Sequence, residues 1–430
     1  MLSAFKEPGD SEQLVITVFL AAQTWPHPLA RYPDPILAKL TNIYFVPHAF
    51  HGDRHQVLYR LHQRYGRIVR IGLQRVSVLD AYALAPIYGV QAIVHARKSR
   101  VIPQAFSEQA LRGMEPLILS AVHNWCFALG IRHADLVDSN RNRGKSRDWS
   151  QPRDMAHCIL NTSLGSVNYV FPLMALNLGI LNIYGQIPIL NRIDFEKWLH
   201  VGTAADRKRQ IAFSRQRLGA RLAARDPDRD EEYGQHELVF EVSLILGAGA
   251  DTANAALTAT FYYLANHPGG PSHISAPAEE SMRLCSPVPM DLPREVLPGG
   301  LQVGDDYLPA GTVVGVPMYA LHHSEECFAR PFVYDPYRCM VRREGRGQFY
   351  SENEVTRSVS PETLALQHQA FVQFSPGSRA CIDRKVALTE LEVGIARVLF
   401  MYDVRLAPGM EHLGDNFVVG KEGPVLHFRG

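Results

Sequence analysis

Apolar residues recur at helical spacing in several stretches of the chain. Residues 55–65 carry them one turn apart, and Gly66 marks the end of this predicted helix. Residues 236–267 are apolar on almost every side and end before a proline, so we expect a long helix that crosses the interior of the domain. Residues 386–399 repeat the helical pattern near the C-terminus.

A period of two predicts a β-hairpin close to the N-terminus. Residues 68–71 and 75–79 alternate between apolar and polar side chains, and they directly follow the first predicted helix. Residues 155–225 are predicted to be helical, and the polar run at residues 140–154 is typical of a loop.

The long predicted helix has an unusual patch at its middle, which reads Gly247-Ala248-Gly249-Ala250-Asp251-Thr252. Glycine, aspartate and threonine are poor helix formers and cost up to about 1 kcal/mol each relative to alanine. The patch is typical of a helix whose backbone another group approaches, either a ligand or a second helix lined with small residues. We expect the Thr252 hydroxyl to bond the carbonyl of Ala248. Asp251 could pass protons from solvent.

Composition sets the class of protein. The 430 residues, 46% of them hydrophobic, suffice for one large domain with a substantial core. A formal charge of +1 excludes the strongly basic character of a general nucleic-acid binder. The 6 cysteines lack paired spacing, so a disulfide framework is not expected.

The N-terminal region has two parts. Residues 14–25 are apolar but shorter than the roughly 20 residues of a membrane span, and they lack the basic leader of a secretory signal. The proline-rich residues 26–35 follow, for which we expect a stiff extended segment.

Cys381 is the strongest candidate for chemistry. It stands between the turn signal Pro376-Gly377 and the last predicted helix, where amide donors, the helix dipole and Arg379 would favour a thiolate. A thiolate at this point could serve as a nucleophile, as a zinc ligand or as an axial haem ligand. Zinc is disfavoured because the chain has no Cys-x-x-Cys pair, whereas a nucleophile paired with a distant base stays open.

The surroundings of Cys381 resemble one family closely. Phe374, Gly377, Arg379 and Cys381 match the cysteine loop Phe-x-x-Gly-x-Arg-x-Cys-x-Gly of cytochrome P-450 haem-thiolate monooxygenases. The resemblance implies that Cys381 binds the haem iron, that Phe374 packs near the sulfur, and that Arg379 meets a haem propionate. The chain departs from the pattern at Asp383, where the family has a small residue and where a carboxylate adds bulk and repels the thiolate.

Other segments match the same family in the expected order. The Gly-x-Asp-Thr patch resembles its proton-delivery motif, which makes Asp251 and Thr252 the implied catalytic pair. The resemblance further implies a supporting network from a Glu-x-x-Arg pair and a Pro-x-Arg segment, and two more groups at the haem propionates. The matching positions are Glu280, Arg283 and Arg338 for the network, and Arg294 and His95 for the propionates.

The resemblance implies a fold that is mainly α with a small β region, in a catalytic domain spanning residues 26–430. It implies haem b as cofactor, NADPH delivered through a separate reductase, and oxidation of an apolar small molecule. The sequence is similar to that of fungal microsomal members of the family, many of which act in secondary metabolism. By this resemblance, residues 1–25 are interpreted as a shortened membrane anchor at the cytoplasmic face of the endoplasmic reticulum. No nucleic-acid partner is expected.

Two other hypotheses follow from departures within the resemblance. The segments before His95 and before Glu280 are shorter than in the family, which together with Asp383 suggests a truncated, inactive homologue that binds haem poorly. The second is a haem-thiolate isomerase or dehydratase that needs no reductase, against which the intact Asp251-Thr252 pair argues.

Overall fold

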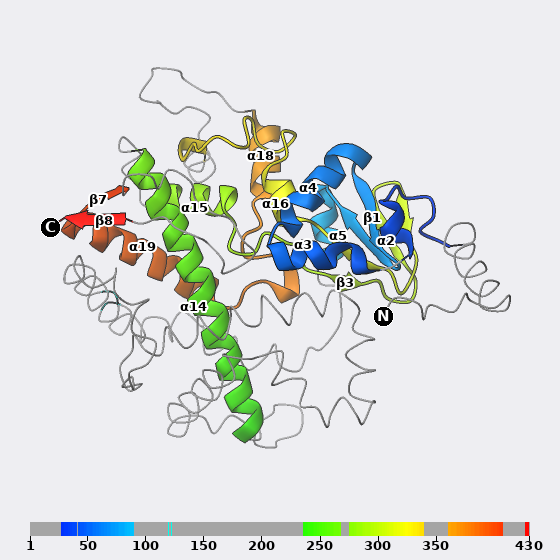
Figure 1. Cartoon of the computed structure of the whole chain (residues 1–430), viewed down its shortest axis with the longest axis horizontal. Coiled ribbons are helices and arrows are strands. Elements are labelled where there is room, and N and C mark those ends of the chain that lie inside the picture. The colour runs from blue at the N-terminus through cyan, green and yellow to red at the C-terminus, as the bar shows by residue number, and fades with distance from the viewer. Residues whose placement is uncertain are drawn as a thin grey trace, which may run out of the picture.

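The computed structural model describes residues 27–40, 42–89, 119, 122, 235–267, 275–338, 360–406 and 426–429. Helices dominate these residues, in agreement with the predicted fold class, and Figure 1 shows them in two groups on either side of the view. The helices in chain order are α2 (Ile36–Leu40), η1 (Asn42–Phe45), α3 (Val46–His51), α4 (Arg54–Tyr65), η2 (Ala81–Ala83), α5 (Leu84–Tyr88), α14 (Gln235–Asn266), α15 (Ser275–Leu284), α16 (Met318–His322), α18 (Pro361–Ala370), η4 (Gly377–Arg379) and α19 (Arg384–Met401).

One group surrounds a small mixed sheet. The sheet order is β1-β2-β6-β3, in which β2 pairs antiparallel with β1 and parallel with β6, and β3 pairs antiparallel with β6. Two further two-stranded sheets are described. The strands are β1 (Ile68–Gly72), β2 (Arg75–Val78), β3 (Arg294–Glu295), β4 (Leu301–Val303), β5 (Asp306–Leu308), β6 (Val313–Gly315), β7 (Asp403–Leu406) and β8 (Leu426–Arg429).

The other group is built on α14, the long green helix of Figure 1. Helices α15 and α19 pack against its C-terminal half, where Ala256 and Phe261 share an apolar cluster with Met282, Leu391 and Ile395. The small side chains along α14 allow this close packing. The cluster fixes α19, and with it the segment that precedes α19, relative to the middle of α14.

The main predicted elements are confirmed. Helix α4 ends at Gly66, whose φ of 93° suits glycine, and residues 68–78 form the expected hairpin. Helix α14 spans the predicted long helix to within one residue at each end. Helix α19 covers the last predicted helix but begins three residues after Cys381.

The prediction of an extended proline-rich segment is wrong for residues 28–31. Residues 28–31 form a turn, in which the amide of Ala30 donates to the carbonyl of His27 and that of Tyr32 to the carbonyl of Leu29. Leu29 and Tyr32 are buried in the core beside the sheet. The apolar contacts of these two side chains outweigh the stiffness of the flanking prolines.

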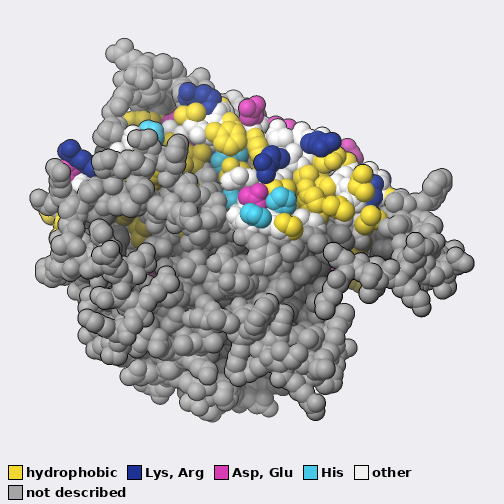
Figure 2. Space-filling view, in the orientation of Figure 1, with side chains coloured by type: hydrophobic (Ala, Val, Ile, Leu, Met, Phe, Trp, Pro, Cys, Tyr) yellow, Lys and Arg dark blue, Asp and Glu magenta, His cyan; other side chains and the backbone are white. Residues whose placement is uncertain are grey.

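The surface of the sheet-bearing group mixes side-chain types. Figure 2 shows hydrophobic side chains interspersed with Lys and Arg over its described part, at the right of the view. Within the described residues, no helix combines the length and the apolar character needed to cross a membrane. Residues 1–25, interpreted as an anchor, lie outside them.

Candidate functional site

Backbone hydrogen bonds shape the loop that carries Cys381. The Cys381 amide donates to the Phe374 carbonyl at 2.7 Å, and the Ala380 amide donates to the Gly377 carbonyl at 3.1 Å. Gly377 has a φ of 81°, and a Cβ at this position would collide with the Tyr88 carbonyl at the end of α5. Glycine is therefore required twice, for its backbone angle and for the close approach of α5.

The thiol of Cys381 is free, and the residue is exposed. Its neighbours desolvate the sulfur enough to raise its pKa, and the charge of Asp383 raises it further, whereas the Asp383 amide and the Arg384 guanidinium lower it. The prediction that the surroundings of Cys381 favour a thiolate is thus wrong in direction. The sequence argument placed Cys381 directly at a helix start, but α19 begins only at Arg384.

The small-residue patch of α14 faces this loop through Asp383. Asp383 Oδ2 lies 3.4 Å from the position that a Cβ on Gly249 would occupy. Asp383 Oδ1 is buried and has no hydrogen-bond partner among the described residues, and burial raises the pKa of this carboxyl. One turn along α14, the Thr252 hydroxyl donates to the Ala248 carbonyl at 2.8 Å, as predicted.

Arg294 and Arg379 form a second part of the site. Burial lowers the pKa of Arg294, and the positive charge of Arg379 lowers it further. The Arg294 guanidinium lies 4.9 Å from the ring centre of Tyr88, and its Nε is buried without a hydrogen-bond partner among the described residues. Two neighbouring guanidinium groups with an unused donor are a favourable setting for a bound carboxylate.

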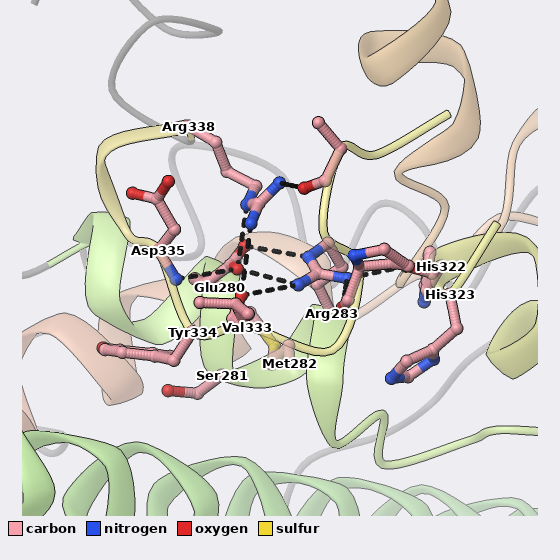
Figure 3. A network of polar contacts seen from close by, with 12 residues as sticks. Glu280, Ser281, Met282, Arg283, His322, His323, Val333, Tyr334, Asp335 and Arg338 are labelled. Carbon is pink, nitrogen blue, oxygen red and sulfur yellow. Dashed lines mark hydrogen bonds and ion pairs between the residues drawn. The ribbon is translucent and has the colours of Figure 1, made fainter. Parts of the chain in front are cut away.

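A buried ionic network supports the site from α15 (Figure 3). Arg283 makes a bidentate pair with Glu280, with N–O distances of 2.9 and 2.8 Å, and Arg338 Nε donates to the same carboxylate at 3.0 Å. The Asp335 amide completes the carboxylate shell at 3.1 Å. Because the side chains of Glu280 and Arg283 are fully buried, each depends on the other for charge compensation.

Comparisons with known proteins give the family. The family model for cytochrome P450, here written cytochrome P-450, matches residues 274–421, which include α15, the ionic network and the cysteine loop. The cytochrome P-450 monooxygenase atnE of Emericella nidulans is 28% identical over 97% of this chain and 95% of its own length. The corresponding enzyme poxM of Penicillium oxalicum is 26% identical over 94% and 90%. The chain thus contains a segment that matches the cytochrome P-450 family model, and fungal cytochrome P-450 monooxygenases are its homologues.

The fold agrees with this assignment. The crystal structure of the cytochrome P-450DA haem domain superposes with a TM-score of 0.57 at 18% identity, covering 88% of this chain and 93% of that one. Because its homologues are named cytochrome P-450 monooxygenases, the chain is an enzyme of the haem-dependent monooxygenase type.

The structure brings several of the predicted residues together. Cys381, Arg379 and Phe374 share one loop, and the Phe374 ring is half-buried beside the α14–α19 cluster. His95 lies outside the described residues, and so does the side chain of Asp251, whose backbone is helical in α14.

Sequence reasoning missed two residues of this site. Tyr88 lies beneath Arg294 and its hydroxyl accepts a hydrogen bond from the Val316 amide at 2.9 Å. Arg384 lies over the Phe374 ring at 5.7 Å. Nothing in the spacing of Tyr88 indicated this role, whereas Arg384, three residues after Cys381, could have been considered as a neighbouring cation.

Proposed function

We propose that Cys381 binds the iron of haem b as a thiolate, and that the enzyme inserts one oxygen atom from dioxygen into an apolar small molecule. Electrons would come from NADPH through a separate reductase. The observation that carries the proposal is the free Cys381 thiol in a loop fixed by backbone hydrogen bonds, which also carries Arg379, whose charge acts on the Arg294 guanidinium.

The residues of the site fit haem at most positions. An exposed thiol suits an iron ligand. The Arg294 Nε, which is buried and has no hydrogen-bond partner within the described part of the chain, and the charge of Arg379 suit the carboxylates of haem propionates. Asp383 is the exception, because its carboxyl faces Gly249 across the space between the cysteine loop and α14. Haem loading therefore requires Asp383 to be accommodated there or to turn away.

When bound, thiolate-ligated haem supplies the activation of dioxygen. In the proposed mechanism, Thr252 Oγ1 holds a proton for delivery into the site and Asp251 replaces it from solvent. Thr252 Oγ1 donates to the Ala248 carbonyl and can accept a hydrogen bond at the same time. Arg294 and Arg379 orient the cofactor, and Tyr88 holds the Arg294 guanidinium in place.

The proposal extends to metabolism and localisation. The fungal source of the curated relatives supports a role in fungal secondary metabolism, and the family resemblance supports a position at the cytoplasmic face of the endoplasmic reticulum. Fractionation of fungal cells that express a tagged full-length chain tests the localisation. Recovery in a fraction other than the microsomal one would contradict it.

An inactive homologue is the second candidate, and it is favoured by the buried Asp383 Oδ1, for which the described residues offer no hydrogen-bond partner. The deciding experiment is expression of the full chain with haem supplied, followed by reduction, addition of carbon monoxide and absorption spectroscopy. We expect a strongly red-shifted Soret band that is absent in Cys381→Ala. A spectrum without haem, or with a band typical of a neutral ligand, would instead support the inactive homologue.

Dependence on the reductase is tested separately. We expect turnover of an apolar substrate only with NADPH and a reductase present. Conversion of a peroxide without either would contradict the monooxygenase mechanism and indicate an isomerase or dehydratase.

A further inference from the structure

A fully buried histidine connects the ionic network to the cysteine loop. His322 is the last residue of α16, and its backbone carbonyl accepts a hydrogen bond from Arg283 Nη1 at 2.6 Å. Figure 3 shows the Arg283 side chain directed toward His322. The same residue therefore meets the network through its backbone and has its imidazole ring available for other contacts.

Both ring nitrogens of His322 face the start of the cysteine loop. Nε2 lies 3.3 Å from the amide nitrogen of Val372, and Nδ1 lies 3.2 Å from the side-chain amide of Gln373. Its neighbour His323 differs, because His323 Nδ1 contacts the Tyr319 carbonyl one turn back in the chain. The Val372 and Gln373 groups are both N–H donors, and the neutral imidazole of His322 accepts at one of its two nitrogens, so His322 accepts a hydrogen bond from this loop in either tautomer.

Gln373 fastens the loop to α15 at two more points. Its side-chain amide donates to the Met282 carbonyl, and its side-chain oxygen accepts from the Ser286 hydroxyl at 3.0 Å. The next residue is Phe374, whose carbonyl accepts the hydrogen bond from the Cys381 amide. A short series of hydrogen bonds thus leads from Arg283 to the backbone of Cys381.

We propose that His322 and Gln373 are positioning residues that fix the cysteine loop, and thereby the sulfur of Cys381, to the buried network. The inference rests on the proposed function, because it assigns this role toward a haem ligand. Rigid support of a metal ligand by residues behind it determines the geometry in which the ligand is held. Phe371, Val372 and Phe374 also pack against the two apolar clusters, but apolar contacts have no preferred direction. The hydrogen bonds of His322 and Gln373 add the directional support that fixes the backbone of the loop.

The first test uses the haem-free full-length chain and amide hydrogen exchange over residues 372–381. We expect Gln373→Met to raise exchange of the Val372, Ser375 and Cys381 amides about fivefold to tenfold, as loss of hydrogen bonds worth about 1–1.4 kcal/mol would do. His322→Leu should raise it at least as much. Unchanged exchange in a folded Gln373→Met variant would overturn the proposal, even if His322→Leu failed to fold.

His62→Leu is the matched control. His62 is also buried, but its ring contacts the Gly66 carbonyl and the Ser77 hydroxyl in the sheet-bearing group. It should lower stability without a selective increase of exchange at residues 372–381. An equal increase in this control would show a general loss of stability and would overturn the positioning role.

The second readout is the carbonyl complex of the reduced, haem-loaded protein. Gln373→Met and His322→Leu should increase the share of the neutral-ligand band relative to the thiolate band, and His322→Gln should restore part of the thiolate band. Failure of the parent protein to give any thiolate band would refute the proposed function. The exchange experiment would still decide whether His322 and Gln373 fix the loop.

Discussion

At the scale of single residues, Asp383 and Gly249 bring the cysteine loop and α14 together at one point. Asp383 is half-buried there, its Oδ1 atom is buried without a hydrogen-bond partner among the described residues, and its side chain makes no cap to α19. Its removal therefore forfeits no described hydrogen bond. It relieves both the bulk and the desolvation of a carboxyl group.

We predict that Asp383→Gly raises the haem content of the purified protein at equal haem supply. Asp383→Asn is the matched control, since it removes the charge and keeps the volume. Haem-to-protein ratios from pyridine haemochrome assays measure the effect. A higher haem content in both variants would show that the charge of Asp383 hinders haem binding. A higher haem content in Asp383→Gly alone would show that the bulk of the side chain hinders it. A lower haem content in Asp383→Gly would show that the carboxyl group assists haem binding and would contradict the prediction.

Gly377 offers a sharper prediction at the same scale. Gly377→Ala should cost more stability than the about 1–2 kcal/mol of a left-handed alanine, because its Cβ would also meet the Tyr88 carbonyl. Gly66→Ala is the control, since Gly66 has a φ of 93° and no atom within 4 Å of an added Cβ. Urea denaturation of both variants measures the difference, and equal losses would mean that the contact with Tyr88 yields easily.

At the scale of elements, α15 and the segment around Arg338 depend on one carboxylate. Glu280→Gln would leave the Arg283 and Arg338 guanidinium groups without a counter-ion in the core, so we predict a loss of about 3–5 kcal/mol in the free energy of unfolding. Asp403→Asn breaks the exposed pair with Arg405 and should cost less than about 1 kcal/mol. Similar losses of unfolding free energy in the two variants would contradict the conclusion that burial makes the Glu280 network more important for stability than an exposed ion pair.

The elements also show what the sequence could and could not predict. The helices α4, α14 and α19 and the hairpin β1–β2 follow from local periodicity and stop signals. The parallel pairing of Arg75 with Val313 does not, because it joins segments that no local pattern relates. The contacts of Tyr88 and His322 were missed for the same reason, since their roles depend on which distant backbone groups the fold places beside them.

At the scale of the whole molecule, buried ionisable groups set the response to acid. Burial lowers the pKa of His62 to about 4 from an ordinary value of 6.5, and it lowers that of His322 well below 6.5. Burial alone would raise the pKa of Asp291, but Arg75 and Arg54 outweigh it and the net pKa is lowered. The unfolded chain therefore takes up protons before the folded protein does.

We predict that stability falls as the pH drops from about 6.5 toward 4, with His62 alone contributing up to about 3 kcal/mol. The contribution of Asp291 is lost only at lower pH, because an ordinary aspartate titrates near 3.8 and its folded pKa lies below that. Urea denaturation at several pH values measures the slope. His62→Asn should flatten it above pH 4, and an unchanged slope would contradict the assignment to His62.

The order of strands in the mixed sheet has a consequence for synthesis on the ribosome. Strands β1 and β2 leave the ribosome early, but their neighbours β6 and β3 are encoded more than 200 residues later. The apolar face of the nascent hairpin therefore stays uncovered while most of the chain is translated. An uncovered apolar face promotes aggregation of the nascent chain. Because β3 carries Arg294, the proposed haem site is completed by the same late event, and chaperone supply during translation should limit the yield of protein that can bind haem.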